Sequence, residues 1–122
     1  MDLAGFIERA RDKKDLSFRK LERASDLDHA YIWHLAKGSK TSPSETTLEK
    51  LSEALSLDER ERAILQLLAE QPIDDALFNL MITRRDIAWD ELRDVSRVSN
   101  RGDRQTTEEG WLKLIEHMRE LF

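Results

Sequence analysis

The stretch that decides the fold is Leu16–Gly38, with the sequence LSFRKLERASDLDHAYIWHLAKG. Its apolar residues recur at spacings of three and four, the period of an amphipathic helix, and no part of it alternates with period two. Ser17 has the residue type of a helix N-cap, because its hydroxyl accepts a hydrogen bond from the first turn. Leu16 precedes it and Leu21 follows four residues later, which is the hydrophobic staple arrangement. A helix is therefore expected to begin at Ser17.

A second helix is expected shortly afterwards. Leu27, Asp28 and Ile32 repeat the staple eleven residues later, which leaves the first helix only about two turns before a tight bend. Asp28 is the expected N-cap of this second helix. Gly38 is expected to end it, because a residue without a side chain suits the left-handed conformation at a helix C-terminus. Two short helices joined by a tight bend form a helix-turn-helix, whose second helix fits the major groove of DNA.

Helical spacing continues on both sides of this stretch. A loop is expected at 39–43, and Ser44 is expected to cap the helix that follows it. Leu57 closes the packed unit. The apolar positions that define the flanking helices are Leu3, Ile7 and Ala10 before the stretch, and Leu48, Leu51 and Leu55 after it.

The second half predicts four more helices. The first of them starts at Ser56 or Asp58 and ends before Pro72, which breaks a helix. Thr106 and Glu109 have capping-box spacing and predict the start of the last helix, after a polar loop. The apolar positions that define these helices are Ile64, Leu67 and Leu68; Leu77, Phe78, Met81 and Ile82; Trp89, Leu92 and Val95; and Trp111, Ile115, Met118 and Phe122.

The chain is thus predicted to be all-α, with a helix-turn-helix domain in residues 1–57 and a small helical domain in residues 58–122. Halves of about sixty residues bury too little surface to be stable alone, so they are expected to lean on each other or on a second copy. We therefore expect a homodimer in which Trp89, Trp111, Ile115 and Met118 form core or dimer seam.

Composition limits the class of protein. The 122 residues include no cysteine, which argues against disulfides and zinc, and no run of eighteen apolar residues, which argues against a membrane span. The expectation is a cytoplasmic, nucleoid-associated protein.

Charge is distributed unevenly. The net charge is -5, and residues 58–122 carry all of it, because residues 1–57 hold equal numbers of acids and bases. Within the first half, the segment Arg9–Lys20 has six bases and two acids. A neutral domain with one basic edge can still bind phosphates, since local charge near the DNA backbone sets the affinity.

The segment Leu16–Leu55 resembles the Xre and phage-repressor helix-turn-helix family, whose lambda-repressor-like fold and DNA binding are then expected here. The resemblance covers about forty residues across four helices. The matching positions are Leu16, Leu21, Leu27, Tyr31-Ile32, Gly38, Pro43-Ser44 and Thr47-Leu48.

This resemblance implies a set of contacts to double-stranded DNA, and the expected homodimer would bind an inverted repeat. Residues on the second helix of the motif are expected to contact bases. Residues at the start of the first helix and in the loop after the second helix are expected to contact phosphates. The implied DNA-binding residues are Ser17, Phe18, Arg19, Asp28, His29, Ala30, Trp33, His34, Lys37, Lys40 and Ser42.

Four positions depart from the family pattern. The family usually has glutamine at Phe18, alanine at Glu22, glycine at Asp26 and a short polar residue at Trp33. A carboxylate at Glu22, where two helices meet, is expected to point outward or to pair with a base such as Arg19. Because of these departures, a helix-turn-helix that binds only proteins stays open as an alternative.

The second half resembles the C-terminal domain of bacterial DNA-damage-response repressors that a partner zinc metallopeptidase inactivates by cutting. The shared features are a helix at Leu92–Val98, the pair Arg101-Gly102 and a tryptophan-led helix at Trp111–Leu121. The resemblance implies a dimeric, stress-responsive repressor whose susceptible bond lies beside Asn100 and Arg101. The family usually has an apolar residue at Asn100, and an ordinary loop between two helices remains the other interpretation.

The sequence gives little support for a metal site or for catalysis. His29 and His34, five residues apart, do not share a helix face as metal ligands four apart would, so no metal or other cofactor is expected. Paired carboxylates such as Asp74-Asp75 and Glu108-Glu109 lie at expected helix starts, where they complement the helix dipole. We expect no enzyme.

Two alternatives to the transcriptional regulator stay open. One is an antitoxin-type protein that neutralises a toxin partner and uses DNA only for its own regulation. The other is a protein-binding adaptor with a degenerate helix-turn-helix.

Overall fold

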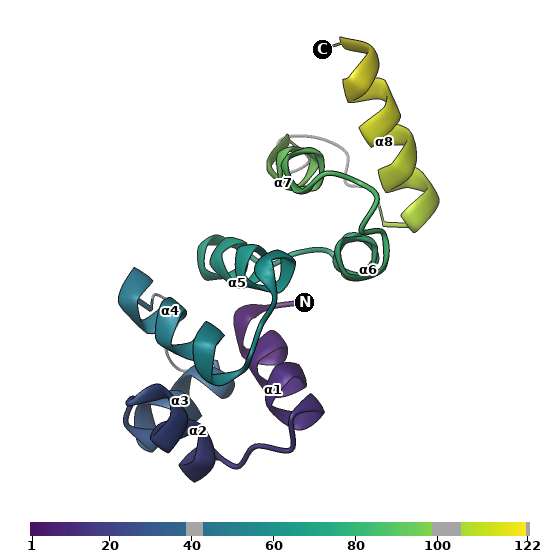
Figure 1. Cartoon of the computed structure of the whole chain (residues 1–122). Coiled ribbons are helices and arrows are strands. Elements are labelled where there is room, and N and C mark those ends of the chain that lie inside the picture. The colour runs from purple at the N-terminus through teal and green to yellow at the C-terminus, as the bar shows by residue number, and fades with distance from the viewer. Residues whose placement is uncertain (39–42, 99–105, 122) are drawn as a thin grey trace. The chain divides into compact units, whose positions relative to one another are not determined.

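The computed structural model describes residues 1–38, 43–98 and 106–121. These residues confirm an all-α fold (Figure 1). None of the described helices is long and apolar enough to cross a membrane. The helices are α1 (Leu3–Lys13), α2 (Phe18–Ser25), α3 (His29–Ala36), α4 (Glu45–Ala54), α5 (Glu59–Glu70), α6 (Asp75–Thr83), α7 (Trp89–Val98) and α8 (Glu108–Leu121).

The chain forms two compact units, Met1–Pro72 and Ile73–Phe122. α5 thus belongs to the first unit, where it packs on α1 and α4. The compact units divide after Pro72, whereas the functional division expected after Leu57 stays a prediction.

The first unit is built around the helix-turn-helix. α3 packs against α1 and α2, and α2 packs against α4, so α3 is supported from its inner side by two helices. Burying apolar side chains from all these helices supplies the driving force for the arrangement. The most deeply buried members of this core are Phe6, Ile7, Leu21, Ile32, Leu35, Leu51, Leu55, Ile64 and Leu65.

Three predicted caps of the first unit are confirmed. The Ser17 hydroxyl accepts from the backbone N–H of Lys20 at 3.1 Å and begins α2. Ser44 begins α4 by accepting from the N–H of Thr47 at 3.2 Å. Asp58, one of the two residues considered, begins α5 in a complete capping box with Glu61, in which each side chain accepts from the other's backbone N–H.

The second unit is a bundle of three helices in which α6, α7 and α8 each contact the other two. Its buried core combines Leu77 and Met81 of α6, Leu92 of α7, and Trp111 and Ile115 of α8.

The start of α8 corrects one expectation. The Thr107 hydroxyl accepts from the N–H of Gly110 at 3.0 Å, and the Thr107 carbonyl accepts from the N–H of Trp111. The capping box predicted for Thr106 and Glu109 is therefore wrong, since Thr107 is the cap and Gly110 has no side chain to complete a box. Adjacent threonines offer the same hydroxyl, and the register that buries Trp111 selects the second of them.

A polar contact ties α8 to the start of α6. Asp74 caps α6 by accepting from the N–H groups of Ala76 and Leu77, at 3.0 and 3.3 Å. The same Asp74 oxygen accepts from the indole Nε1 of Trp111 at 2.9 Å. The buried indole N–H thereby finds an acceptor, which it needs when water is excluded.

Replacing Asp74 with alanine should therefore destabilise the second unit by more than the loss of a helix cap. The cap contributes about 1 kcal/mol, and an unpaired buried N–H costs about 1–3 kcal/mol. We expect a loss of roughly 2–4 kcal/mol in denaturant unfolding followed by tryptophan fluorescence. Glu120→Ala, which removes an exposed carboxylate of α8, is the matched control and should change little. Equal effects of the two substitutions would contradict the role given to Asp74.

Candidate nucleic-acid interface

The turn between α2 and α3 has the geometry of a helix-turn-helix. Asp26 ends α2 in the left-handed conformation, with φ of 59°. Its N–H donates to the carbonyl of Glu22, and the N–H of Leu27 donates to the Ser25 hydroxyl at 3.2 Å. Glycine is the residue that adopts this conformation without strain, and aspartate tolerates it better than most others. The departure from the family's glycine at Asp26 is therefore compatible with the bend.

The outward face of α3 carries the residues predicted to read bases. Ile32, Leu35 and Ala36 are buried on the inner side of the helix, whereas Ala30, Trp33 and Lys37 are exposed. His29 and His34 are partly exposed between the two sides. The structure thus brings His29, Ala30, Trp33, His34 and Lys37 together on the accessible part of α3.

Trp33 lies in the middle of this face with 44% of its surface exposed. Its ring meets the His34 ring edge to face, with centroids 5.2 Å apart and planes at 83°. A large apolar side chain exposed at this place is available for contact with sugars, thymine methyl groups or another protein.

Glu22 takes the capping role that was expected of Asp28. Asp28 occupies the N-cap position of α3, but its side chain makes no capping hydrogen bond. Instead, the Oε2 atom of Glu22 accepts from the backbone N–H of His29 at 2.6 Å. Asp28 is therefore the N-cap residue of α3, as predicted, but the side-chain hydrogen bond of the cap comes from Glu22 of α2.

The same Glu22 oxygen also contacts the His29 ring. Oε2 lies 2.6 Å from the imidazole Nδ1, while the nearest oxygen of Asp28 lies 3.7 Å from that nitrogen. The hydrogen bond from the His29 backbone is the largest of the effects that lower the pKa of Glu22 below its usual 4.5; the bond from the His29 ring and the charge of Arg19 act in the same direction. The main partner of the Glu22 carboxylate is therefore His29, and the expected partner Arg19 contributes to the lowered pKa through its charge.

The ring of Phe18, in the first turn of α2, contacts the guanidinium group of Arg11. The guanidinium carbon of Arg11 lies 4.3 Å from the centroid of the Phe18 ring. Arg11 also donates to the Leu16 carbonyl at 2.9 Å and pairs with Glu8 at 2.6 Å. This arginine of the basic segment therefore holds the loop between α1 and α2 and is committed to the fold.

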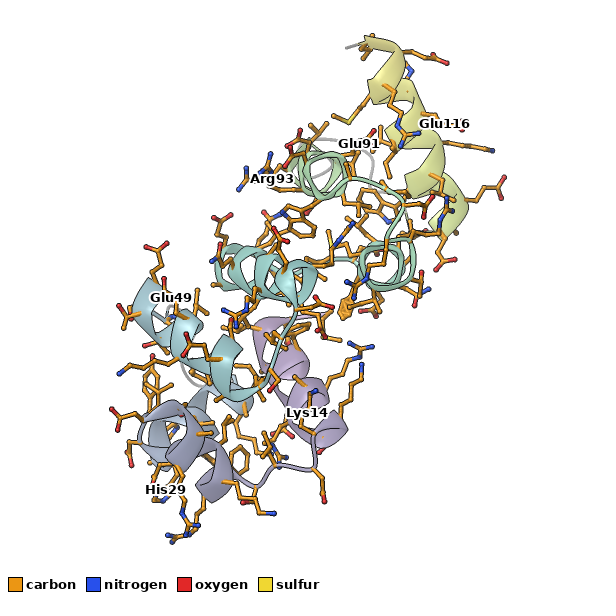
Figure 2. All side chains as sticks on the ribbon, viewed as in Figure 1. Lys14, His29, Glu49, Glu91, Arg93 and Glu116 are labelled. Carbon is orange, nitrogen blue, oxygen red and sulfur yellow. The ribbon has the colours of Figure 1, made fainter. Side chains whose placement is uncertain are left out.

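Other bases of the same segment remain exposed. Lys13 is the last residue of α1 and Lys14 is its C-cap, and Arg19 and Lys20 lie in the first turn of α2. Figure 2 shows Lys14 and His29 on the first unit, at the end of α1 and the start of α3 respectively. These cations are available to meet phosphates beside the helix-turn-helix.

Some predicted site residues lie outside the described residues. These are Lys40 and Ser42, expected to contact phosphates, and Asn100 and Arg101, expected to flank a cleavage site.

The residues expected to form core or dimer seam divide into two groups. Trp111 and Ile115 are buried inside the second unit, whereas Trp89 and Met118 are only partly covered. Met118 lines a groove between α7 and α8, whose other lining residues are Glu91, Asp94, Val95, Ile115 and Arg119. Arg119 pairs with Glu91 across this groove.

Among the described residues, Glu22, Asp28 and His29 are the one group able to hold a metal ion. Their ligand atoms lie within 4.8 Å of one another. The Glu22 oxygen already accepts two hydrogen bonds from His29, which a metal ion would have to displace.

The comparison with protein families agrees with this geometry. The helix-turn-helix domain family matches residues 2–65, a segment that contains α1 to α4 and the first part of α5. The chain belongs to the helix-turn-helix domain family. Among curated proteins, the chain has no match. Membership in this family indicates DNA as the binding partner of the first unit.

Two contacts of the helix-turn-helix domain were not predicted from the sequence. The pair Glu22–His29 joins residues seven apart on two different helices, and Arg11–Phe18 joins the end of α1 to the start of α2. The signal for the first was the carboxylate at a position where the family has alanine, since a charge beside a helix N-terminus is a natural cap.

Stability of the first unit should fall in acid partly through Glu22. A carboxyl whose pKa is lowered by folding stabilises the folded state above its unfolded pKa, and this contribution is lost as pH falls through the folded pKa. Between about pH 6 and about pH 3, Glu22→Gln should therefore lose less stability than the native chain. Thermal unfolding followed by circular dichroism measures this. Glu49→Gln, at an exposed carboxylate of α4, is the control, and identical pH profiles for E22Q and the native chain would refute the assignment.

Proposed function

We propose that the protein is a sequence-specific transcriptional regulator that binds DNA through the outward face of α3. The observation that carries this proposal is the grouping of His29, Ala30, Trp33, His34 and Lys37 on the accessible side of the second helix of a helix-turn-helix. Membership in the helix-turn-helix domain family supports it.

In the proposed complex α3 enters the major groove, and its first-turn side chains reach base edges. His29 and His34 hydrogen-bond to bases or phosphates, Ala30 meets a thymine methyl group, and Trp33 lies against sugars or methyl groups. Phosphates are held around this helix by side chains and by the backbone amides at the start of α2, where a helix leaves its first N–H groups without helical partners. The proposed phosphate contacts come from Ser17, Phe18, Arg19, Lys37, Lys40 and Ser42, with Asp28 at the edge of the site.

The second unit is proposed to dimerise the protein. Its support is two exposed apolar side chains, one on each of two helices of this unit: Val98 of α7 is 51% exposed and Leu121 of α8 is 63% exposed. Two heads held about 34 Å apart, one turn of duplex, would bind an inverted repeat with the avidity that a single small head lacks.

Repression and its relief by proteolysis are the finer part of the proposal. A cut beside Asn100 and Arg101 by a metallopeptidase would separate α8 from α6 and α7. α8 supplies Trp111 and Ile115 to the core of the second unit, so its loss would dismantle that unit and lower operator affinity. A chain truncated after Gly102 that stays dimeric by light scattering would contradict this mechanism.

Protein binding is the second candidate function, in the form of an antitoxin or an adaptor. The exposed Trp33 on α3 favours it, because a large apolar side chain suits a protein interface as well as a groove. The acidic balance of residues 58–122 points in the same direction. Salt separates the two candidates, since DNA affinity falls steeply as salt rises and apolar protein contacts change little.

Selection of bound sequences from random duplex DNA, at about 50 mM and about 200 mM salt, tests the proposed function. We expect an enriched inverted repeat with half-sites one turn apart, bound by a particle with the mass of a dimer. No enriched sequence at either salt concentration would overturn the DNA-binding proposal and favour protein binding.

Two substitutions assign the contacts once a sequence is enriched. Lys37→Ala should weaken all sequences alike and reduce the salt slope by about one, while Lys113→Ala on α8 serves as the control and should not. His29→Ala should reduce the preference for one base at one position by about tenfold. An unchanged preference in H29A would show that α3 does not sit in the groove as proposed.

A further inference from the structure

We propose that Glu22 is a positioning residue that fixes which nitrogen of the neutral His29 ring carries hydrogen, so that Nε2 meets a base as a hydrogen-bond acceptor. This inference rests on the proposed function, because it requires α3 to meet the bases. It concerns the contact that His29 makes with a base, and it can be wrong even if the protein binds DNA.

The geometry places the ring between Glu22 and the outside of the protein. His29 is the first residue of α3, and 45% of its side chain is exposed. Its backbone N–H and its Nδ1 both meet the same Glu22 oxygen at 2.6 Å, which holds the main chain and the ring in one orientation. Among the described residues, Nε2 makes no hydrogen bond, so it is the ring nitrogen left to meet a base.

An ionised carboxylate accepts hydrogen bonds and donates none, so the proton between Oε2 and Nδ1 belongs to the imidazole. The lowered pKa of Glu22 keeps the carboxylate ionised at neutral pH. In the neutral ring, Nδ1 therefore carries the hydrogen and Nε2 carries a lone pair.

The two tautomers of a neutral ring recognise different bases. The tautomer that Glu22 fixes offers an acceptor at Nε2, which matches the amino groups of adenine N6 or cytosine N4 in the major groove. The other tautomer offers a donor at Nε2, which matches guanine N7 or O6. Without Glu22, the ring would be free to carry its hydrogen on Nε2 and to donate to guanine.

The neighbouring charges do not replace Glu22 in this role. Asp28, which precedes α3, lies 3.7 Å from Nδ1, beyond hydrogen-bonding distance. Arg19 of α2 acts on Glu22 by charge and favours its ionised form. Of the described residues of α1 and α4, which pack on α3 and α2, none forms an ion pair with Glu22 or His29.

The state of the ring is measured in the free protein by the ¹⁵N chemical shifts of its two nitrogens, assigned by their absence in His29→Gln. At about pH 8, where histidine is mostly neutral, the native chain should show the hydrogen on Nδ1. Glu22→Ala should move it toward Nε2, and Glu22→Gln, whose amide oxygen still accepts, should preserve the native state. Hydrogen on Nε2 in the native chain would overturn the proposal, as would a native pattern in E22A.

The consequence for recognition is measured by DNA selection at about pH 8, with a chelator present so that a metal ion cannot occupy Glu22, Asp28 and His29. The native chain and E22Q should prefer adenine or cytosine at one position by about tenfold. E22A should prefer guanine at that position, and H29A should show no preference there.

The outcomes separate this inference from the proposed function. If the native chain and E22A enrich the same base at that position, the inference is wrong and DNA binding stands. If no variant enriches any sequence, the proposed function is wrong, and the ¹⁵N shifts alone decide whether Glu22 fixes the ring.

Discussion

The packing of α2 against α3 around Leu21 and Ile32 is the contact on which the candidate interface depends. Both side chains are fully buried, and Leu35 joins them from the next turn of α3. Burying the inner side of α3 leaves its other side outward. The left-handed Asp26 makes the bend tight enough for this packing, because it ends α2 within one residue. A substitution that loosens this contact would shift the position of α3 as a whole, even though every side chain on its outer face stayed the same.

Polar contacts at the ends of helices then set where each helix begins and how His29 is oriented, which apolar packing leaves open. Ser17, Ser44 and Asp58 fix where α2, α4 and α5 begin. Glu22 begins α3 from a neighbouring helix and at the same time orients His29. Because one oxygen serves both purposes, the stability of the helix start and the chemistry of the outward face are linked in a single carboxylate.

Local patterns were enough to predict the helices of both units and most of their caps, since a cap and its partner lie within one turn. The choice between Thr106 and Thr107 needed the position of the buried Trp111, which is a tertiary constraint. The placement of the base-reading positions on α3 followed from helical periodicity together with the family resemblance. The Glu22–His29 pair could not follow from periodicity, because it depends on the angle between two helices.

The central claim is that the outward face of α3 meets duplex DNA. Its most direct test is the change in backbone amide NMR shifts of the full chain when a selected duplex is added. The account predicts that the largest changes occur from Ser17 to Lys37, with His29 and Trp33 among them. Largest changes in α6 to α8, with α3 unaffected, would contradict it.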